Sequence, residues 1–395
     1  MTGQVARVVG RDPGTGRLVE VLVDDGVVAQ VRALGAEASS EPGGEPWLVP
    51  GLVDLQVNGF AGLDVNGPDV TPDVVVELVR ALARAGTTTF VPTVVTSAES
   101  DLLRSLRAVA EARRRDDGAR HAIPFVHLEG PHISAEDGPR GVHPAEHVRE
   151  PDPAELRRWQ EAADGLVGLV TISPHWDAST AYVRHAVASG VRIAIGHTHA
   201  TPEQVHEAAA AGASLATHLG NGAHAVLPRH PNYVWAQLAD DRLTGCFIAD
   251  GHHLPADTLT AMLRAKGPDR AVLVSDSVAL AGLPPGEYTT PVGGRVHLSA
   301  DGRLSEVGTP FLAGAARTLA DGVAGAARLA GLDLAGALRL ATTNPGRVVG
   351  GRGVLTPGAP ADVLLVDHEP GADSLGVRDV VVGGVRIGRG PVGAA

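Results

Sequence analysis

The chain has 395 residues, with 33 basic against 45 acidic side chains and a formal net charge of −12. This balance argues against a nucleic-acid-binding protein, which normally presents a basic face. The single cysteine, Cys246, can form neither an internal disulfide nor a cysteine metal cluster, so we expect a reducing compartment and a metal, if any, held by His, Asp or Glu. The N-terminus carries no signal-peptide pattern and no apolar run reaches about 18 residues, which predicts a cytoplasmic protein without a membrane partner.

The two ends of the chain share a β-type pattern of short apolar runs broken by turns. These runs are Val5–Val9, Leu18–Val23 and Val27–Val31 at the front, and Ala361–Val366 and Val377–Arg386 at the back. Such runs predict strands. We therefore expect a small β-sandwich domain built from both chain ends, residues 1–50 and 351–395.

Between these ends, strand-like and helix-like runs alternate. The predicted strands are Leu52–Asn58, Thr87–Val95, Ala122–Glu129, Leu166–Ser173, Val191–His197, Ser214–Leu219, Leu243–Ala249 and Ala271–Asp276. The predicted helices are Asp73–Ala85, Glu99–Arg115, Pro153–Ala163, Thr180–Ala188, Pro202–Ala211 and Pro255–Arg264, with further helices within Gly308–Ala341. Eight βα units predict an α/β fold, a (β/α)8 TIM-like barrel over residues 51–350.

Polar residues concentrate where the predicted strands end. Seven of the eight strands end in or beside a potential ligand: Gln56 and Asn58, His127 and Glu129, Ser173 and His175, His197 and His199, His218 and Asn221, Asp250 with His252 and His253, and Asp276. Active sites of such barrels lie at the carboxyl ends of the strands. The pattern therefore places a site at this end of the barrel.

A metal site is the most specific hypothesis for these residues. His197 and His218 end separate strands, where two neutral imidazoles can converge on one cation, and Glu129 can add an oxygen ligand. A single strand-end histidine more often hydrogen-bonds a loop carbonyl. The combination favours a metal, because two imidazoles and one carboxylate leave an open position for water, as hydrolytic sites require.

Other polar residues have both a functional and a structural interpretation. Asp276 could act as a general base and acid near that metal, or could cap a loop. His143 and the pair His252–His253 lie in Gly- and Pro-rich loops, where substrate contacts and exposed polar residues are both common. Arg229 could pair with a phosphate or remain solvated.

The ordered motifs resemble the amidohydrolase superfamily, and within it the N-acetylglucosamine-6-phosphate deacetylase family. They are PGLVDLQVNG, HLEGPH, RGVHP, GHTHAT, THLGN, IADGHH, LVSDS, ATTNPGR and PGAPADVLLVD, and they span essentially the whole chain. Related hydrolases usually begin the barrel with His-x-His and often carry a carboxylated lysine, whereas this chain has Gln56 and Asn58 and no lysine near a strand end. The resemblance therefore implies one metal rather than two.

The resemblance implies a role for each matching residue. Glu129, His197 and His218 would hold one divalent metal, with zinc as the first candidate and iron, cobalt or manganese as alternatives. Asp276 would be the general base and then acid, and His143 would polarise the acetyl carbonyl and hold the sugar. His253, Asn221 and the backbone at Gly222 and Ala223 would contact the sugar phosphate. Arg229 would bind phosphate across a homodimer interface.

Some positions depart from the family pattern. Gly220–His224 replaces a bulkier loop, and His175 and His199 stand where Glu and Asn are usual, so they could bind substrate or a second cation. The expected reaction is hydrolysis of N-acetylglucosamine 6-phosphate to glucosamine 6-phosphate and acetate, in amino-sugar recycling. The alternatives are another N-acyl substrate, such as N-acetylgalactosamine 6-phosphate or an unphosphorylated N-acyl amine, and a non-catalytic scaffold.

Overall fold

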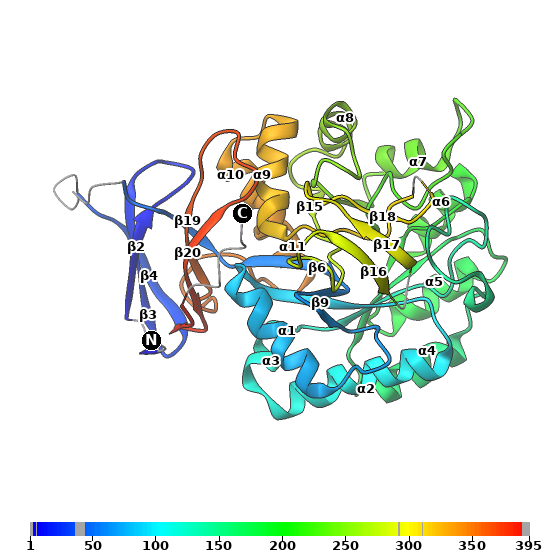
Figure 1. The fold of residues 1–395 in the computed structure, drawn as a ribbon, viewed down its shortest axis with the longest axis horizontal. Helices are drawn as coiled ribbons and strands as arrows, with labels where there is room; N and C mark the ends of the chain where they lie inside the picture. The colour runs from blue at the N-terminus through cyan, green and yellow to red at the C-terminus, as the bar shows by residue number, and fades with distance from the viewer. Residues whose placement is uncertain (1–2, 5, 36–43, 291–292, 310, 389–395) are drawn as a thin grey trace.

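The computed structural model describes residues 3–4, 6–35, 44–290, 293–309 and 311–388 (Figure 1). Parts of the predicted small domain, namely residues 1–2, 5, 36–43 and 389–395, lie outside the described residues, as does the first residue of the predicted strand Val5–Val9. Within the described ranges, no helix combines the length and the apolar character needed to cross a membrane.

Eight parallel strands form a nearly closed barrel in the middle of the chain. In chain order they are β6 (Leu52–Val57), β9 (Thr87–Val95), β10 (Val126–Glu129), β11 (Val167–Ile172), β12 (Arg192–Ile195), β13 (Leu215–Ala216), β14 (Thr244–Phe247) and β15 (Ala271–Leu273). The first and last strands meet where the backbone N–H of Asp276 donates to the carbonyl of Gln56 over 3.0 Å. The predicted (β/α)8 barrel is confirmed.

The barrel interior is filled by side chains, so the strands are buried on both faces. The inner cluster includes Val53, Leu55, Val91, Leu169, Ile248 and Val274, together with the buried Cys246. Each strand therefore reads as a largely apolar run in the sequence, although a few buried polar residues such as Asp54 and Thr171 lie within strands.

Helices cover the outside of the barrel (Figure 1). They are α1 (Pro72–Arg84), α2 (Glu99–Arg115), α3 (Asp117–Ala122), α4 (Pro153–Ala162), α5 (Ser179–Ala188), α6 (Pro202–Ala211), α7 (Tyr233–Ala239), α8 (Ala256–Lys266), α9 (Leu319–Ala330), α10 (Leu334–Ala341) and α11 (Thr343–Val348), with the 3₁₀ turn η1 (Ala145–His147). Local capping explains several starts. Thr201 and Gln204 form a capping box at α6, and Thr71 accepts from the N–H of Val74 at α1.

The chain ends form a separate eight-stranded sheet. Its strands are β1 (Gly3–Gln4), β2 (Arg7–Arg11), β3 (Leu18–Asp24), β4 (Val27–Ala33), β5 (Trp47–Pro50), β19 (Val363–Asp367), β20 (Gly376–Val382) and β21 (Val385–Arg386), in the order β1-β21-β20-β19-β5-β2-β3-β4. Side chains from both ends share one core, for example Val8 and Val21 with Val363 and Val381. Residues remote in sequence thus complete one sheet. The exact domain boundaries remain a prediction.

Two smaller sheets were not predicted. Strands β7 (Gly59–Phe60) and β8 (Leu63–Asp64) pair after β6, and β16 (Gly286–Thr290), β17 (Gly294–Leu298) and β18 (Leu304–Glu306) form an antiparallel insertion after β15. The predicted strand at residues 122–129 also starts later, at Val126, because Asp116 caps the short helix α3, which ends at Ala122. By contrast, β9 and α2 have the predicted boundaries.

Candidate active site

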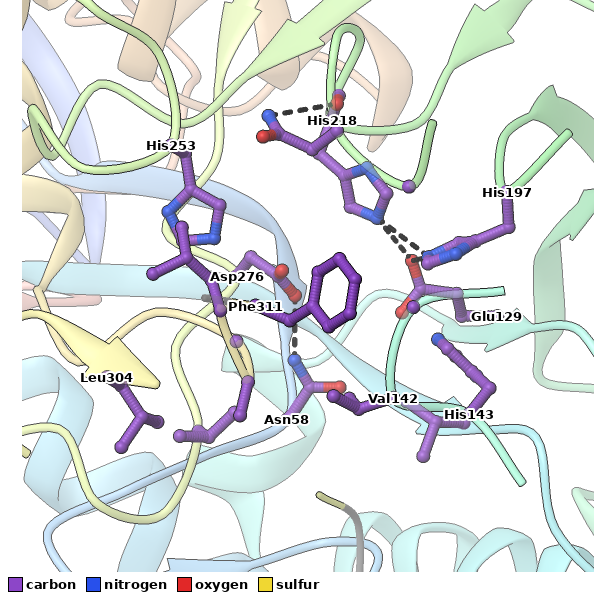
Figure 2. A pocket seen from close by; sticks show the side chains of 18 of the residues that line it. Asn58, Glu129, Val142, His143, His197, His218, His253, Asp276, Leu304 and Phe311 are labelled. Atoms are coloured by element: carbon purple, nitrogen blue, oxygen red, sulfur yellow. Dashed lines mark hydrogen bonds and ion pairs between the residues drawn. The ribbon is translucent and has the colours of Figure 1, made fainter. Parts of the chain in front are cut away.

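A cavity of about 400 Å³ opens at the carboxyl ends of the barrel strands (Figure 2). Most of the predicted site residues line it: Asn58, Glu129, His143, His197, His218, Asn221, Gly222, Ala223, His253 and Asp276. Among the described residues, neither lysine nor arginine lines the cavity, whereas three carboxylates do, those of Asp64, Glu129 and Asp276. The pocket thus offers a concentrated negative charge to a cation.

Three donor atoms converge on one wall of this pocket. Glu129 Oε1 lies 2.8 Å from His218 Nε2 and 3.3 Å from His197 Nε2, and the two nitrogens are 3.0 Å apart. Donors about 2.1 Å from a common cation would be separated by about 3.0–3.4 Å. All three side chains are at least nine-tenths buried. The cluster therefore has the spacing and composition of a site for a divalent metal.

The backbone that carries this cluster is locally strained. His197, His218 and Asp276 have φ angles of 47°, 27° and 51°, in the left-handed region that residues other than glycine rarely adopt. Each of these residues follows directly or closely after a barrel strand, where the chain turns out of the sheet. The turn directs the side chain over the barrel mouth instead of continuing the strand alternation.

The cluster is electrostatically coupled. Burial alone would raise the pKa of Glu129, but hydrogen bonds from His197 and His218 hold that pKa well below its usual range. Burial lowers the pKa of His218, but the hydrogen bond with Glu129 and the charges of Glu129 and Asp276 together outweigh burial and raise the pKa to about 9. Glu129 is therefore an anion, and the protein stabilises positive charge beside it.

Asp276 lies next to this cluster and is held by two amides. Asn58 Nδ2 donates to Asp276 Oδ1 over 2.8 Å, and Gln56 Nε2 donates to the same oxygen over 3.0 Å and to Glu129 Oε1 over 2.9 Å. Burial raises the pKa of Asp276 to about 6, and the charge of Glu129 is the second largest contribution to this rise. The Gln56 amide thus bridges the carboxylates of Glu129 and Asp276, although Gln56 itself does not line the pocket.

His143 contributes a further imidazole. Its ring packs edge-on against His197 with centroids 4.4 Å apart, and one ligand atom each from Glu129, His143 and His197 lie within 4.8 Å of one another. Burial lowers the pKa of His143 to about 3, so the ring is neutral at neutral pH. Its Nδ1 is buried without a protein partner. A neutral imidazole here can donate a hydrogen bond or add a ligand.

The predicted sugar-phosphate contacts come from the loops after β13 and β14. His253 Nδ1 lies 2.7 Å from Asp250 Oδ2, so Nδ1–H donates to that carboxylate and orients the ring. Burial would raise the pKa of Asp250, but the hydrogen bond and the charge of His253 lower it. Asn221, Gly222 and Ala223 lie on the loop after β13.

The structure does not bring every predicted residue into the pocket. Arg229 is exposed on the loop between β13 and α7 and does not line the cavity of its own chain. His175 and His199 lie outside the cavity lining and stack on each other, with ring centroids 4.0 Å apart.

An apolar wall of the pocket was missed by sequence reasoning. Leu304, Phe311 and Leu312 come from the insertion that includes β16–β18, and Val142 faces them from the loop after β10 (Figure 2). Phe311 remains half exposed. The only sequence signal for this wall was the alternation of residues 286–298, and the side chains themselves carry no reactive group.

Comparison with known proteins yields a consistent set of relatives. Residues 47–387 match the model of the amidohydrolase family. An N-acetylgalactosamine-6-phosphate deacetylase of Escherichia coli O157:H7 is 32% identical over 88% of this chain and 90% of its own, and an N-acetylglucosamine-6-phosphate deacetylase of Vibrio furnissii is 32% identical over 77% and 74%. A Mycobacterium smegmatis N-acetyl-D-glucosamine-6-phosphate deacetylase variant, solved with N-acetyl-D-glucosamine 6-phosphate, superposes with a TM-score of 0.85 at 31% identity, over 97% of this chain and 99% of that chain.

Proposed function

The chain belongs to the amidohydrolase family, and from this membership and its pocket we propose that it hydrolyses the N-acetyl group of N-acetylglucosamine 6-phosphate. The products would be glucosamine 6-phosphate and acetate. The observation that carries the proposal is the juxtaposition of a His₂Glu cluster with the buried carboxylate of Asp276 in one pocket. The lone buried cysteine fits a reducing compartment, for which we propose the cytoplasm.

We assign the metal to Glu129, His197 and His218. The donor set fits a divalent cation, because the three atoms are 2.8–3.3 Å apart and the buried carboxylate remains ionised. Zinc is the first candidate, and iron, cobalt and manganese accept the same donors. When bound, such a cation supplies Lewis acidity and lowers the pKa of water.

Asp276 is positioned to move the proton in this reaction. Its carboxylate accepts the proton of the attacking water and then donates it to the nitrogen of the leaving amine. The amides of Gln56 and Asn58 both donate to Oδ1, which keeps Oδ2 available for this transfer. A pKa of about 6 suits the role, because the carboxylate is ionised at neutral pH yet basic enough to take a proton.

His143 and the loops after β13 and β14 would hold the substrate. The neutral His143 ring can donate a hydrogen bond to the amide carbonyl oxygen as negative charge develops there. His253, Asn221 and the backbone at Gly222 and Ala223 would contact the sugar phosphate. No lysine or arginine of the described chain lines the pocket. The family resemblance implies that Arg229 of a second subunit in a homodimer neutralises the phosphate, and we assign that role to it.

N-acetylgalactosamine 6-phosphate is a second candidate substrate. A relative that matches 88% of this chain is named for that sugar, and the loop beside the sugar position consists of the small residues Gly220, Asn221, Gly222 and Ala223. Small side chains leave room for the alternative orientation of one hydroxyl group.

The experiment compares kcat/KM for acetate release from N-acetylglucosamine 6-phosphate, its galacto epimer and unphosphorylated N-acetylglucosamine. We expect the wild type to prefer the phosphorylated gluco sugar, and Arg229→Ala to lose most of the preference for phosphate while it still turns over the unphosphorylated sugar. Preference for the galacto epimer would select the second candidate. Equal turnover with and without phosphate would refute the phosphate assignment, and a protein with neither metal nor turnover would point to a scaffold.

A further inference from the structure

A second histidine cluster lies beside the pocket, on the loops that follow four consecutive strands, β10 to β13. Its centre is Glu136. His224 Nε2 lies 2.8 Å from Glu136 Oε2, and His199 Nε2 lies 3.7 Å from Glu136 Oε1. The His175 ring packs against His199 with centroids 4.0 Å apart and an interplanar angle of 41°. Three imidazoles and one carboxylate therefore lie together, and the catalytic assignment uses none of them.

The three rings share one hydrogen-bonding pattern. In each ring Nδ1 is engaged by a hydroxyl group, which leaves Nε2 for another partner. The pairs are Ser173 with His175 at 2.6 Å, Ser134 with His199 at 2.6 Å, and Tyr233 with His224 at 3.1 Å. Histidines that bind metals characteristically have their second nitrogen held by an outer hydrogen bond, which sets the ring orientation. A hydroxyl group can accept from Nδ1–H, which is the arrangement that leaves the Nε2 lone pair for a metal.

The cluster is also anchored to the barrel. Ser134 Oγ accepts from the backbone N–H of Glu136 over 3.0 Å, and the backbone N–H of Ser134 donates to the carbonyl of His197 over 2.8 Å. These two bonds tie the loop that carries Glu136 to the end of the loop segment at His197.

We propose that Glu136, His199 and His224, with the His175 ring packed beside them, form a second cation site that binds Zn²⁺ or a similar divalent transition metal. The imidazole-rich donor set favours zinc, cobalt, nickel or copper over magnesium and calcium, which prefer oxygen ligands. The site is separate from the Glu129 cluster, since the two groups share no side chain. Glu136, at 53% side-chain exposure, faces solvent from which the metal can enter.

Such a site would cross-link two loops at the mouth of the pocket. Glu136 belongs to the loop after β10, which also carries His143, and His224 belongs to the loop after β13, which also carries Asn221. Without a metal, the two loops are joined there by the partly exposed hydrogen bond between His224 Nε2 and Glu136. A bound cation would hold the two loops together more firmly.

The test is a metal count on the full chain. The protein is stripped with a chelator and titrated with Zn²⁺, and bound metal is measured by plasma mass spectrometry. We expect two equivalents in the wild type and one in each of Glu136→Gln and His224→Gln, with at least tenfold weaker binding of the second equivalent. Glu129→Gln should also bind one equivalent and lose it when combined with Glu136→Gln. His185→Gln, an exposed histidine on α5, is the matched control and should bind two.

Three results would overturn the second site. They are one equivalent in the wild type, an unchanged count in Glu136→Gln, or the loss of both equivalents in Glu129→Gln, which would place two metals in the pocket. Circular dichroism of each variant excludes misfolding as the cause of a lower count. The readout is metal content, so the result stands whether or not the proposed deacetylation is observed.

Discussion

The Nδ1 atom of His197 donates a hydrogen bond to the backbone carbonyl oxygen of Pro139 over 2.7 Å. Because a carbonyl oxygen is only an acceptor, this bond assigns the ring proton to Nδ1 and leaves the lone pair on Nε2. Nε2 is the atom that faces Glu129 and His218. The same bond ties the loop after β10 to the end of β12, so loop position and ligand orientation are set together.

Substitution of Gly222 should disturb this ring. A Cβ at Gly222 would lie 2.8 Å from His197 Nδ1, and the φ of 57° is itself unfavourable for alanine. We expect Gly222→Ala to weaken metal binding by about 10–100-fold, the usual effect of losing support for a metal ligand. Competition with a chromophoric chelator measures the affinity. Gly190→Ala, at φ 83° with no atom within 4 Å, controls for backbone strain and should retain wild-type affinity.

Removal of the carboxylate ligand should remove the catalytic metal. Glu129→Gln keeps the size of the side chain but loses the charge that balances a cation beside His197 and His218. We expect loss of one metal equivalent and at least a hundredfold fall in kcat/KM. Asp64→Asn is the matched control, since it changes another carboxylate of the same pocket. Wild-type activity in Glu129→Gln would refute the ligand assignment.

Asp276 should govern the acid side of the pH profile. Burial, with a smaller contribution from the charge of Glu129, raises the pKa of Asp276 to about 6. The reaction needs the ionised form of this carboxylate. Activity should therefore fall about tenfold per unit as the pH drops below the pKa. A cation bound to Glu129 offsets part of the effect that the Glu129 charge has on the pKa of Asp276. The midpoint of the pH dependence of kcat/KM should therefore lie at or below pH 6. Asp276→Asn should keep its metal, lose about 10²–10⁴-fold in kcat, and no longer show this limb. An unchanged limb in the variant would assign it to another group.

The sequence was informative wherever burial or reactive chemistry restricts the residue type. Strand β9 is buried along its whole length and reads as an uninterrupted apolar and threonine run, so its boundaries were predicted. One rule, that parallel strands end on the same side of a barrel, predicted that Glu129, His197 and His218 lie close together. Whether these residues carry the assigned roles remains a prediction.

Features that depend on shape were not predictable in this way. Phe311 reaches the pocket only because the insertion β16–β18 folds over it, and nothing in the local pattern indicates that placement. The bridging of Glu129 and Asp276 by Gln56 joins residues 73 and 220 positions away. Polar contacts over such separations follow from the closed barrel, and periodicity does not encode them.

Lys266, the only lysine of the chain, should matter for stability. It is 1% exposed, and its Nζ donates to the backbone carbonyls of Asp240 and Leu243, each over 2.8 Å. Lys266→Met fills a similar space but removes this donor from both carbonyls. The Asp240 carbonyl still accepts from the N–H of Leu243 over 3.1 Å, so the main loss is at the Leu243 carbonyl, and a buried unsatisfied group costs about 1–3 kcal/mol. We expect a lower free energy of unfolding in urea. Arg264→Met, exposed on the same helix, should be close to neutral, and an equal loss in both variants would contradict the explanation.

The most direct test of the proposed function follows acetate release from N-acetylglucosamine 6-phosphate by the same protein before chelation, after chelation and after metal is restored. We expect turnover in the first sample, at least a hundredfold loss in the second and recovery with Zn²⁺, Fe²⁺, Co²⁺ or Mn²⁺ in the third. Full turnover by metal-free protein, or none by metal-loaded protein, would contradict the account.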